Sequence, residues 1–177
     1  MTFLDLVQRT IDILDVVDRD DEEMVKAVKN AINVAYMTIA RDKYRPEKCE
    51  TVRVVDGKIA IDKLSECYVS LKTVQSVGGM RIAAWESVNN IHISPSYYQV
   101  NVFYYYLPKA LEGDFDVPVI PASAVDPYAY IYYAASYYFS VKRKHAEAAV
   151  WDSRYKNLTD NIKEVRSSFT LPVKRWQ

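Results

Sequence analysis

The fold is decided by residues 107–162, which read LPKALEGDFDVPVIPASAVDPYAYIYYAASYYFSVKRKHAEAAVWDSRYKNLTDNI. An acidic turn over 112–116 leads through a proline-bounded segment to Asp126-Pro127, a pair typical of a helix start, with Asp as N-cap and Pro at the first helical position. The next segment is so dense in tyrosine and alanine that apolar surface covers nearly every side. We therefore expect a central, buried helix over 127–143.

A second, charged helix is predicted to follow over 146–166. Its inner face is predicted to consist of small and apolar residues at helical spacing: Ala146, Ala149, Val150, Ser153, Leu158, Ile162 and Val165. No glycine or proline marks the break between the two helices. The two helices are expected to pack on each other as a hairpin.

The N-terminal part of the chain predicts another helical pair. Thr2 and Asp5 have the spacing of a capping box, and apolar residues then recur every three or four positions. This pattern predicts helices over 2–17 and 21–42, joined by an acidic link that begins at Asp18. Two short helices with such a link are expected to be antiparallel.

Residues 50–107 change to the short alternating runs of β-strands. Asp56-Gly57 lies between two such runs and predicts a β-hairpin, because the tight turn of a hairpin needs positive φ. The expected fold is therefore α+β and mainly α: two N-terminal and two C-terminal helices form a four-helix bundle, interrupted by a small antiparallel β insertion. Residues 1–167 are expected to be one domain, and 168–177 an extended C-terminal tail.

Composition excludes several classes of function. Lys and Arg number 23, as do Asp and Glu, so the net charge is zero and the basic surface typical of proteins that grip nucleic acid is not indicated. No apolar run is long enough to span a membrane, and an acid at position 5 replaces the basic flank of a secretory signal. We expect a protein made in a cytoplasm, with Cys49 and Cys67 as reduced thiols.

No catalytic, cofactor-binding or metal-binding pattern stands out. The four glycines form no phosphate-binding loop, and the acids over 18–23 lack calcium-loop spacing, so capping of helices explains them better. We expect no cofactor, no metal and no enzymatic activity. The alternative is a small cytoplasmic enzyme or ligand-binding protein with a tyrosine-lined pocket between the sheet and the 127–143 helix, in which His92 and Glu86 are the only pair to nominate.

The C-terminal tail has apolar residues at near-alternating positions beyond the last predicted helix. One interpretation is that it folds back as an edge strand; the other is that it adds to a partner protein. The residues alone do not decide between these two interpretations of the tail.

The order helix–helix–β–helix–helix–tail resembles the head-tail adaptor (connector, or head completion) proteins of tailed bacteriophages. The resemblance rests mainly on 104–155: a strand ending in Tyr-Tyr-Leu-Pro, an acidic loop, Val-Pro-Val-Ile-Pro, the tyrosine-rich helix and a charged helix that contains Arg154-Tyr155. It covers about a third of the chain by motif and the rest only by element order. It implies a virion structural protein without catalytic activity.

The resemblance also implies partners and a location. Such proteins form a homo-oligomeric ring, commonly a dodecamer, in the virion neck between the capsid portal and the tail or the next neck ring, and DNA passes through the lumen without specific binding. The tail is then implied to dock on the portal through Phe169, Leu171, Pro172, Val173 and Trp176. Contacts between subunits are implied for Tyr128, Tyr132, Arg154, Lys156, Lys163 and Glu164. Another neck or tail-completion ring protein is an equally compatible member of this class.

Overall fold

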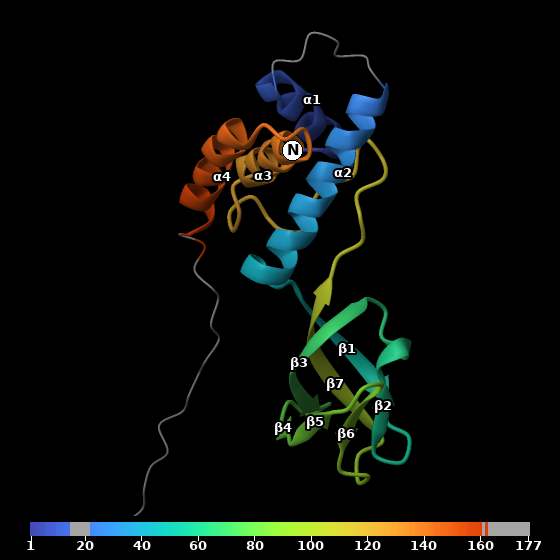
Figure 1. The fold of residues 1–177 in the computed structure, drawn as a ribbon. Coiled ribbons are helices and arrows are strands. Elements are labelled where there is room, and N and C mark those ends of the chain that lie inside the picture. The colour runs from blue at the N-terminus through green and yellow to red at the C-terminus, as the bar shows by residue number, and fades with distance from the viewer. Residues whose placement is uncertain (15–21, 161, 163–177) are drawn as a thin grey trace, which may run out of the picture.

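A computed structural model describes residues 1–14, 22–160 and 162, which form a helical lobe and a β lobe at opposite ends of the molecule (Figure 1). The helical lobe contains α1 (Phe3–Leu14), α2 (Glu22–Ile39), α3 (Tyr128–Val141) and α4 (His145–Thr159). A π-helical turn, η1 (Ala40–Tyr44), continues α2.

Local sequence signals explain where these helices begin. The capping box is confirmed: the Thr2 amide donates to Asp5 Oδ2 at 2.9 Å, and the Asp5 amide donates to Thr2 Oγ1 at 3.2 Å. Before α3, Asp126 Oδ1 accepts the amide of Tyr128 at 2.9 Å, although Pro127 rather than Asp126 is the last residue before the helix. Both contacts satisfy amides that have no partner inside their helix.

The β lobe consists of two antiparallel sheets. One has the strand order β1-β7-β3-β4 and the other β2-β6-β5. The strands are β1 (Glu47–Arg53), β2 (Lys58–Ala60), β3 (Cys67–Ser76), β4 (Arg81–Ile82), β5 (Ala84–Glu86), β6 (Asn90–Ile93) and β7 (Gln99–Leu107), with a short 3-10 turn, η2 (Ile61–Lys63), after β2.

The hairpin predicted at Asp56-Gly57 does not form, although its turn does, because the turn connects the two sheets. Both residues have positive φ, 51° and 73°, and a single bridge joins Val55 to Lys58 across the turn. Beyond it the strands part, since β1 pairs with β7 and β2 with β6. A Cβ at position 57 would lie 2.8 Å from the carbonyl oxygen of Ile93, so the close approach of these strands also requires glycine.

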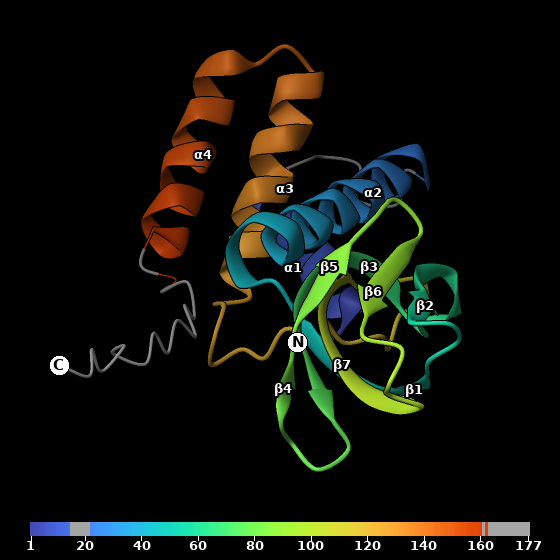
Figure 2. The ribbon, with the colours of Figure 1, turned by 90° about the horizontal axis from the view of Figure 1, so that it is seen from below.

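The predicted four-helix bundle with a small β insertion is wrong. The β lobe has seven strands and a hydrophobic core of its own, which includes Ile59, Val74 and Ile91. The helices do not form a bundle either: α3 is central and packs on α1, α2 and α4, and α2 runs across α3 and α4 rather than alongside them (Figures 1 and 2). Bundle packing needs helices that are nearly parallel or antiparallel.

The chain passes between the lobes twice, at 45–46 and at 107–108. The amide of Tyr106 donates to the carbonyl of Pro46 at 3.0 Å, which holds the two passages together. Arg45 has a φ of 52°, a left-handed conformation that turns the chain out of η1 and into β1. Leu107 packs against the helical core, so the end of β7 belongs to both lobes.

Candidate interaction surface

A row of aromatic and arginine side chains runs across α1, α3 and α4. The rings of Tyr128 and Tyr132 lie 5.8 Å apart, and that of Trp151 lies 5.6 Å from Tyr132. Arg9 lies over Tyr128 at 5.7 Å, and Arg154 lies over Trp151 at 4.4 Å. We call these five side chains the aromatic–arginine row.

The row is built by helix geometry. Tyr128 and Tyr132 are four residues apart, so they lie on one face of α3, and the antiparallel α4 places Trp151 beside them. Arg9 also donates from Nη1 to the Tyr128 hydroxyl at 2.5 Å, which ties α1 to the start of α3. The three rings are half-buried and both arginines exposed, so the row supports the helical lobe and also presents a surface.

Neither arginine of the row has an ion pair with a carboxylate among the described residues. Each is held by an aromatic face instead, an interaction worth about 0.5–1 kcal/mol at an exposed site. Aromatic and arginine side chains are the types that most often dominate binding at protein interfaces. The row therefore has the composition of a contact surface.

Two of the residues implied to lie between subunits behave differently from each other. Arg154 belongs to the row. Lys156 is paired within the chain, at 2.6 Å from Asp152 one helical turn earlier, and this hydrogen bond raises the pKa of Lys156. Its charge is therefore already compensated.

Tyr128 and Tyr132, which are also implied to lie between subunits, belong to the row, and the remaining implied contacts lie outside the described residues. These are Lys163 and Glu164, together with the implied portal-docking residues Phe169, Leu171, Pro172, Val173 and Trp176. The row itself includes two side chains that the sequence analysis missed, Arg9 and Trp151. The four-residue spacing of Tyr128 and Tyr132 can be seen in the sequence, but no sequence pattern predicted that Arg9 of α1 would contact Tyr128.

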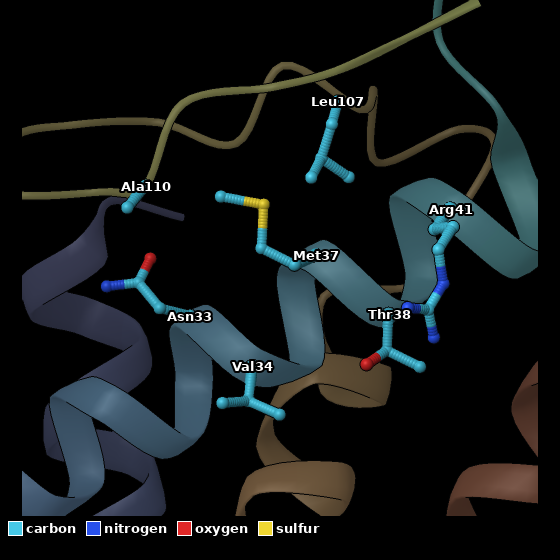
Figure 3. Close-up of a pocket in the computed structure, with 7 residues that line it drawn as sticks. All are labelled: Asn33, Val34, Met37, Thr38, Arg41, Leu107 and Ala110. Atoms are coloured by element: carbon cyan, nitrogen blue, oxygen red, sulfur yellow. The ribbon is translucent and has the colours of Figure 1, made fainter. Parts of the chain in front are cut away.

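A hollow of about 340 Å³ lies between α2 and the segment that leaves β7 (Figure 3). In it Met37 and Leu107 point toward one another, and Arg41 lies at one end. The wall is fixed by Asn33, whose side chain donates to the carbonyl of Leu111 at 2.9 Å and accepts its amide at 2.8 Å. Apart from Asn33, Thr38 and Arg41 the lining is apolar, so the hollow offers few groups that could orient a small polar ligand.

A second hollow of about 270 Å³ lies at the junction of the lobes and is lined by Tyr36 and Tyr106 among others. It is the closest match to the expected tyrosine-lined pocket, but its lining comes from α2, the β lobe and the 108–119 segment rather than from α3. Its acids are already engaged: Glu66 pairs with Lys48 at 3.0 Å, and Asp116 accepts two backbone amides. Because these acids already have partners, few polar groups of the hollow remain to bind a substrate.

The densest polar cluster in the described chain lies on the β lobe around Glu50. Its carboxylate accepts the hydroxyls of Ser65 and Tyr104, and Lys48 Nζ lies 2.6 Å from Ser65 Oγ. Burial raises the pKa of Glu50, but the bonds from Ser65 and Tyr104 outweigh it and hold that pKa below its usual value. Burial and the bond to Glu50 raise the pKa of Tyr104 to about 12.

This cluster does not have the properties of a nucleophile and its base. The hydrogen bond to Glu66 raises the pKa of Lys48, so the amine holds its proton and cannot take one from Ser65. A lysine that activates a serine needs a lowered pKa, so that it is neutral and can accept the proton. The arrangement is better explained as a network that ties β1 to the segment before β3.

His92 and Glu86, nominated for the enzyme alternative, lie on opposite faces of one sheet. Trp85 is the direct cross-strand partner of His92, so Glu86, the next residue, points the other way. His92 stacks on Trp85 at 5.3 Å and lies 2.9 Å from Ser87 Oγ, whereas Glu86 binds the Tyr68 hydroxyl and the Leu71 amide. The two do not form an acid–base pair.

Within the described ranges, no group of three or more His, Cys, Asp or Glu side chains is placed to hold a metal ion. None of the helices there has the length and apolar character needed to cross a membrane. Cys49 and Cys67 are both free and exposed.

No protein-family model and no curated protein matches this chain. The interpretation of its function therefore rests on the residues themselves and on the resemblance described above. Of the features described, the aromatic–arginine row is the one whose composition indicates contact with another protein.

Proposed function

We propose that this chain is a structural component of a tailed-phage virion: a head-tail adaptor that forms a ring beneath the portal. In this proposal the protein joins the capsid to the tail or to the next neck ring, and DNA passes through the ring. Twelve copies per ring are the number that the resemblance favours. No catalytic role is assigned to any residue.

The observation that carries the proposal is the aromatic–arginine row. Its rings and cations are held in place by contacts within the subunit, yet both arginines face outward without a carboxylate partner among the described residues. Preformed aromatic and arginine groups lower the ordering cost of association. A ring subunit needs such a surface, because each copy must contact its neighbours.

The two-lobed shape supports the same function. The lobes have separate cores and lie at opposite ends of the molecule (Figure 1), so a subunit offers one end to each of two neighbours along an axis. The neutral net charge also suits a ring around DNA, since tight phosphate contacts would oppose passage. In the Glu50 cluster of the β lobe, by contrast, Lys48 keeps its proton and offers Ser65 no base.

Mass photometry of the full chain, alone and mixed with the portal protein of the same virus, tests the proposal. We expect a large complex of fixed stoichiometry in the mixture, and its loss when residues 168–177 are deleted. A truncated chain that still binds the portal would show that the tail is not the docking segment. A full chain that forms no complex with the portal would contradict the adaptor function.

A further inference from the structure

A ridge of exposed apolar side chains follows the acidic turn after β7. Phe115, Val117 and Val119 are 85%, 59% and 58% exposed, and they alternate along residues 115–119. We call residues 112–119 the acidic ridge, because it also carries Glu112, Asp114 and Asp116. Large apolar side chains that are exposed this close together along the chain are candidates for protein contact.

The ridge is held by the rest of the fold. Asp116 Oδ2 accepts the amides of Glu112 and Gly113, both at 2.8 Å, and these bonds lower the pKa of Asp116. The amides of Phe3 and Leu4 donate to carbonyls of the ridge at 2.7 and 3.0 Å.

Contacts to α2 complete the support. The Val119 amide donates to the Tyr36 hydroxyl at 3.0 Å, and Lys29 pairs with Asp114 at 3.0 Å. Phe115 is thus exposed on a backbone that is already ordered, so a partner that buries it has little loop-ordering entropy to overcome.

The chain itself contains a surface complementary to this ridge. The aromatic–arginine row has three rings to receive apolar side chains, and its arginines at positions 9 and 154 have no carboxylate partner among the described residues. The ridge supplies apolar side chains and the carboxylate of Glu112, which has no ion pair among the described residues, whereas Asp114 and Asp116 are already engaged. Opposite charges at the rim of an apolar contact fix its register and speed association.

The contact cannot form within one subunit. Phe115 is 85% exposed while its neighbours Asp114 and Asp116 are bonded to the start of α1, so the ridge of the same chain is not on the row. Moreover, the segment after β7 rises along the side of α2 away from α4, which carries Trp151 and Arg154 (Figure 1). A second copy is the partner whose charge and apolar groups match.

We propose that the acidic ridge of one copy docks on the aromatic–arginine row of the next. The interface is heterologous, since different surfaces of the two copies meet, and such contacts repeat head to tail and close into rings. This inference rests on the proposed ring function and identifies the contact that would build the ring. Phe115 is the anchor, and Glu112 is the acid that pairs with Arg9 or Arg154.

Thiol cross-linking between single-cysteine variants tests the contact. Both native thiols are exposed and are first replaced, Cys49→Ser and Cys67→Ser. Val117→Cys then marks the ridge, and Val150→Cys marks α4 one turn before Arg154, at a side chain that is 53% exposed and outside the row. A short bis-maleimide is added to each variant alone, to their mixture and to the double variant, in the free protein and in any portal complex.

We expect cross-linked dimers from the mixture and a ladder of larger products from the double variant. Adding Phe115→Ser should lower the yield of mixed dimers at least about tenfold, as for a hot-spot residue. Val88→Ser, at a β-lobe position that is 94% exposed, is the matched control and should leave the yield unchanged. Both substitutions replace exposed side chains, so folding is not at stake.

Two results would overturn the proposal: no mixed dimer in either preparation, or efficient cross-linking of Val117→Cys with itself, which would indicate a two-fold contact. These outcomes are separable from failure of the adaptor function. A portal complex without the cross-link leaves the adaptor function intact and removes this contact. A cross-linked ladder without portal binding would support this contact and contradict the adaptor function.

Discussion

The buried side chains of the β lobe are almost all aliphatic, whereas the helical lobe combines aliphatic residues with tyrosine and alanine. Nine of the ten core residues of the β lobe are Val, Ile or Leu, and the exception is Tyr104, whose hydroxyl binds Glu50. The helical core includes Tyr36, Tyr130 and Tyr155, and its partly buried rings extend outward into the aromatic–arginine row.

This difference separates the tasks of the two lobes. In the β lobe, the main polar clusters join one strand or turn to another, as Glu50 joins β1 to Ser65 and Glu86 of β5 joins Tyr68 and Leu71 of β3. In the helical lobe, the aromatic layer continues from core to surface and ends in the two arginines of the row, which have no carboxylate partner among the described residues. The β lobe is therefore organised for internal stability, and the helical lobe also offers a contact.

The largest effect that tests the separation of the two cores is a cavity in the β lobe. Ile91 is fully buried in the central strand of its sheet, so Ile91→Ala should destabilise that lobe by about 2–5 kcal/mol. Because the described part of the chain passes between the lobes only at 45–46 and 107–108, amide hydrogen exchange should accelerate in β2, β5 and β6 and stay nearly unchanged in α3. Val88→Ala, at an exposed position, should alter neither. Equal loss of protection in α3 would mean that the lobes unfold as one unit.

A smaller effect, limited to the β lobe, depends on pH. The pKa of Glu50 is lower in the folded protein than in the unfolded chain, so its ionised form stabilises the fold. This stabilisation is present above the unfolded value, about 4.3, and is lost as pH falls through the lower folded pKa. Glu50→Gln should cost about 1 kcal/mol at neutral pH.

The same substitution should make urea stability less sensitive to acid, because the titrating group is gone. Urea unfolding at a series of pH values from neutral to strongly acidic measures the free energy of unfolding at neutral pH and its decrease in acid. Glu147→Gln, an exposed carboxylate of α4, serves as the control and should keep the acid dependence of the unaltered chain. If the free energy of unfolding depended on pH identically in Glu50→Gln and in the unaltered chain, titration of Glu50 would not contribute to acid sensitivity.

Sequence patterns predicted individual elements better than their assembly. The Thr2–Asp5 capping box and the Asp56-Gly57 turn are encoded by residues a few positions apart, and both occur in the structure. The size of the β core could not be judged in this way, since it depends on which strands pair. Pairing of β1 with β7 joins residues about fifty positions apart, and no local pattern specifies that register.

The helix-four pattern was misread for a related reason. Val150, predicted to face inward, is exposed, and the buried side chains of α4 are Ala148, Tyr155 and Thr159. A mixture of small, charged and aromatic residues gives α4 a weak apolar periodicity, so the sequence did not favour one face strongly. The same ambiguity concealed Trp151, one of the five side chains of the aromatic–arginine row.

The smallest predicted effect concerns two neighbouring tyrosines of the helical core. Tyr36 and Tyr130 pack edge to face at 6.0 Å, but only Tyr36 has a hydrogen-bond partner for its hydroxyl among the described residues, the amide of Val119. Burial raises the pKa of both phenols. Tyr36→Phe should cost about 1 kcal/mol, because the Val119 amide loses its acceptor, whereas Tyr130→Phe should be neutral or slightly stabilising, because it removes a buried hydroxyl that has no such bond. Urea denaturation of the two variants measures this difference, and each is the control for the other because both delete one oxygen from the same ring pair. If Tyr130→Phe were the more destabilising of the two, its hydroxyl would have a partner outside the described residues.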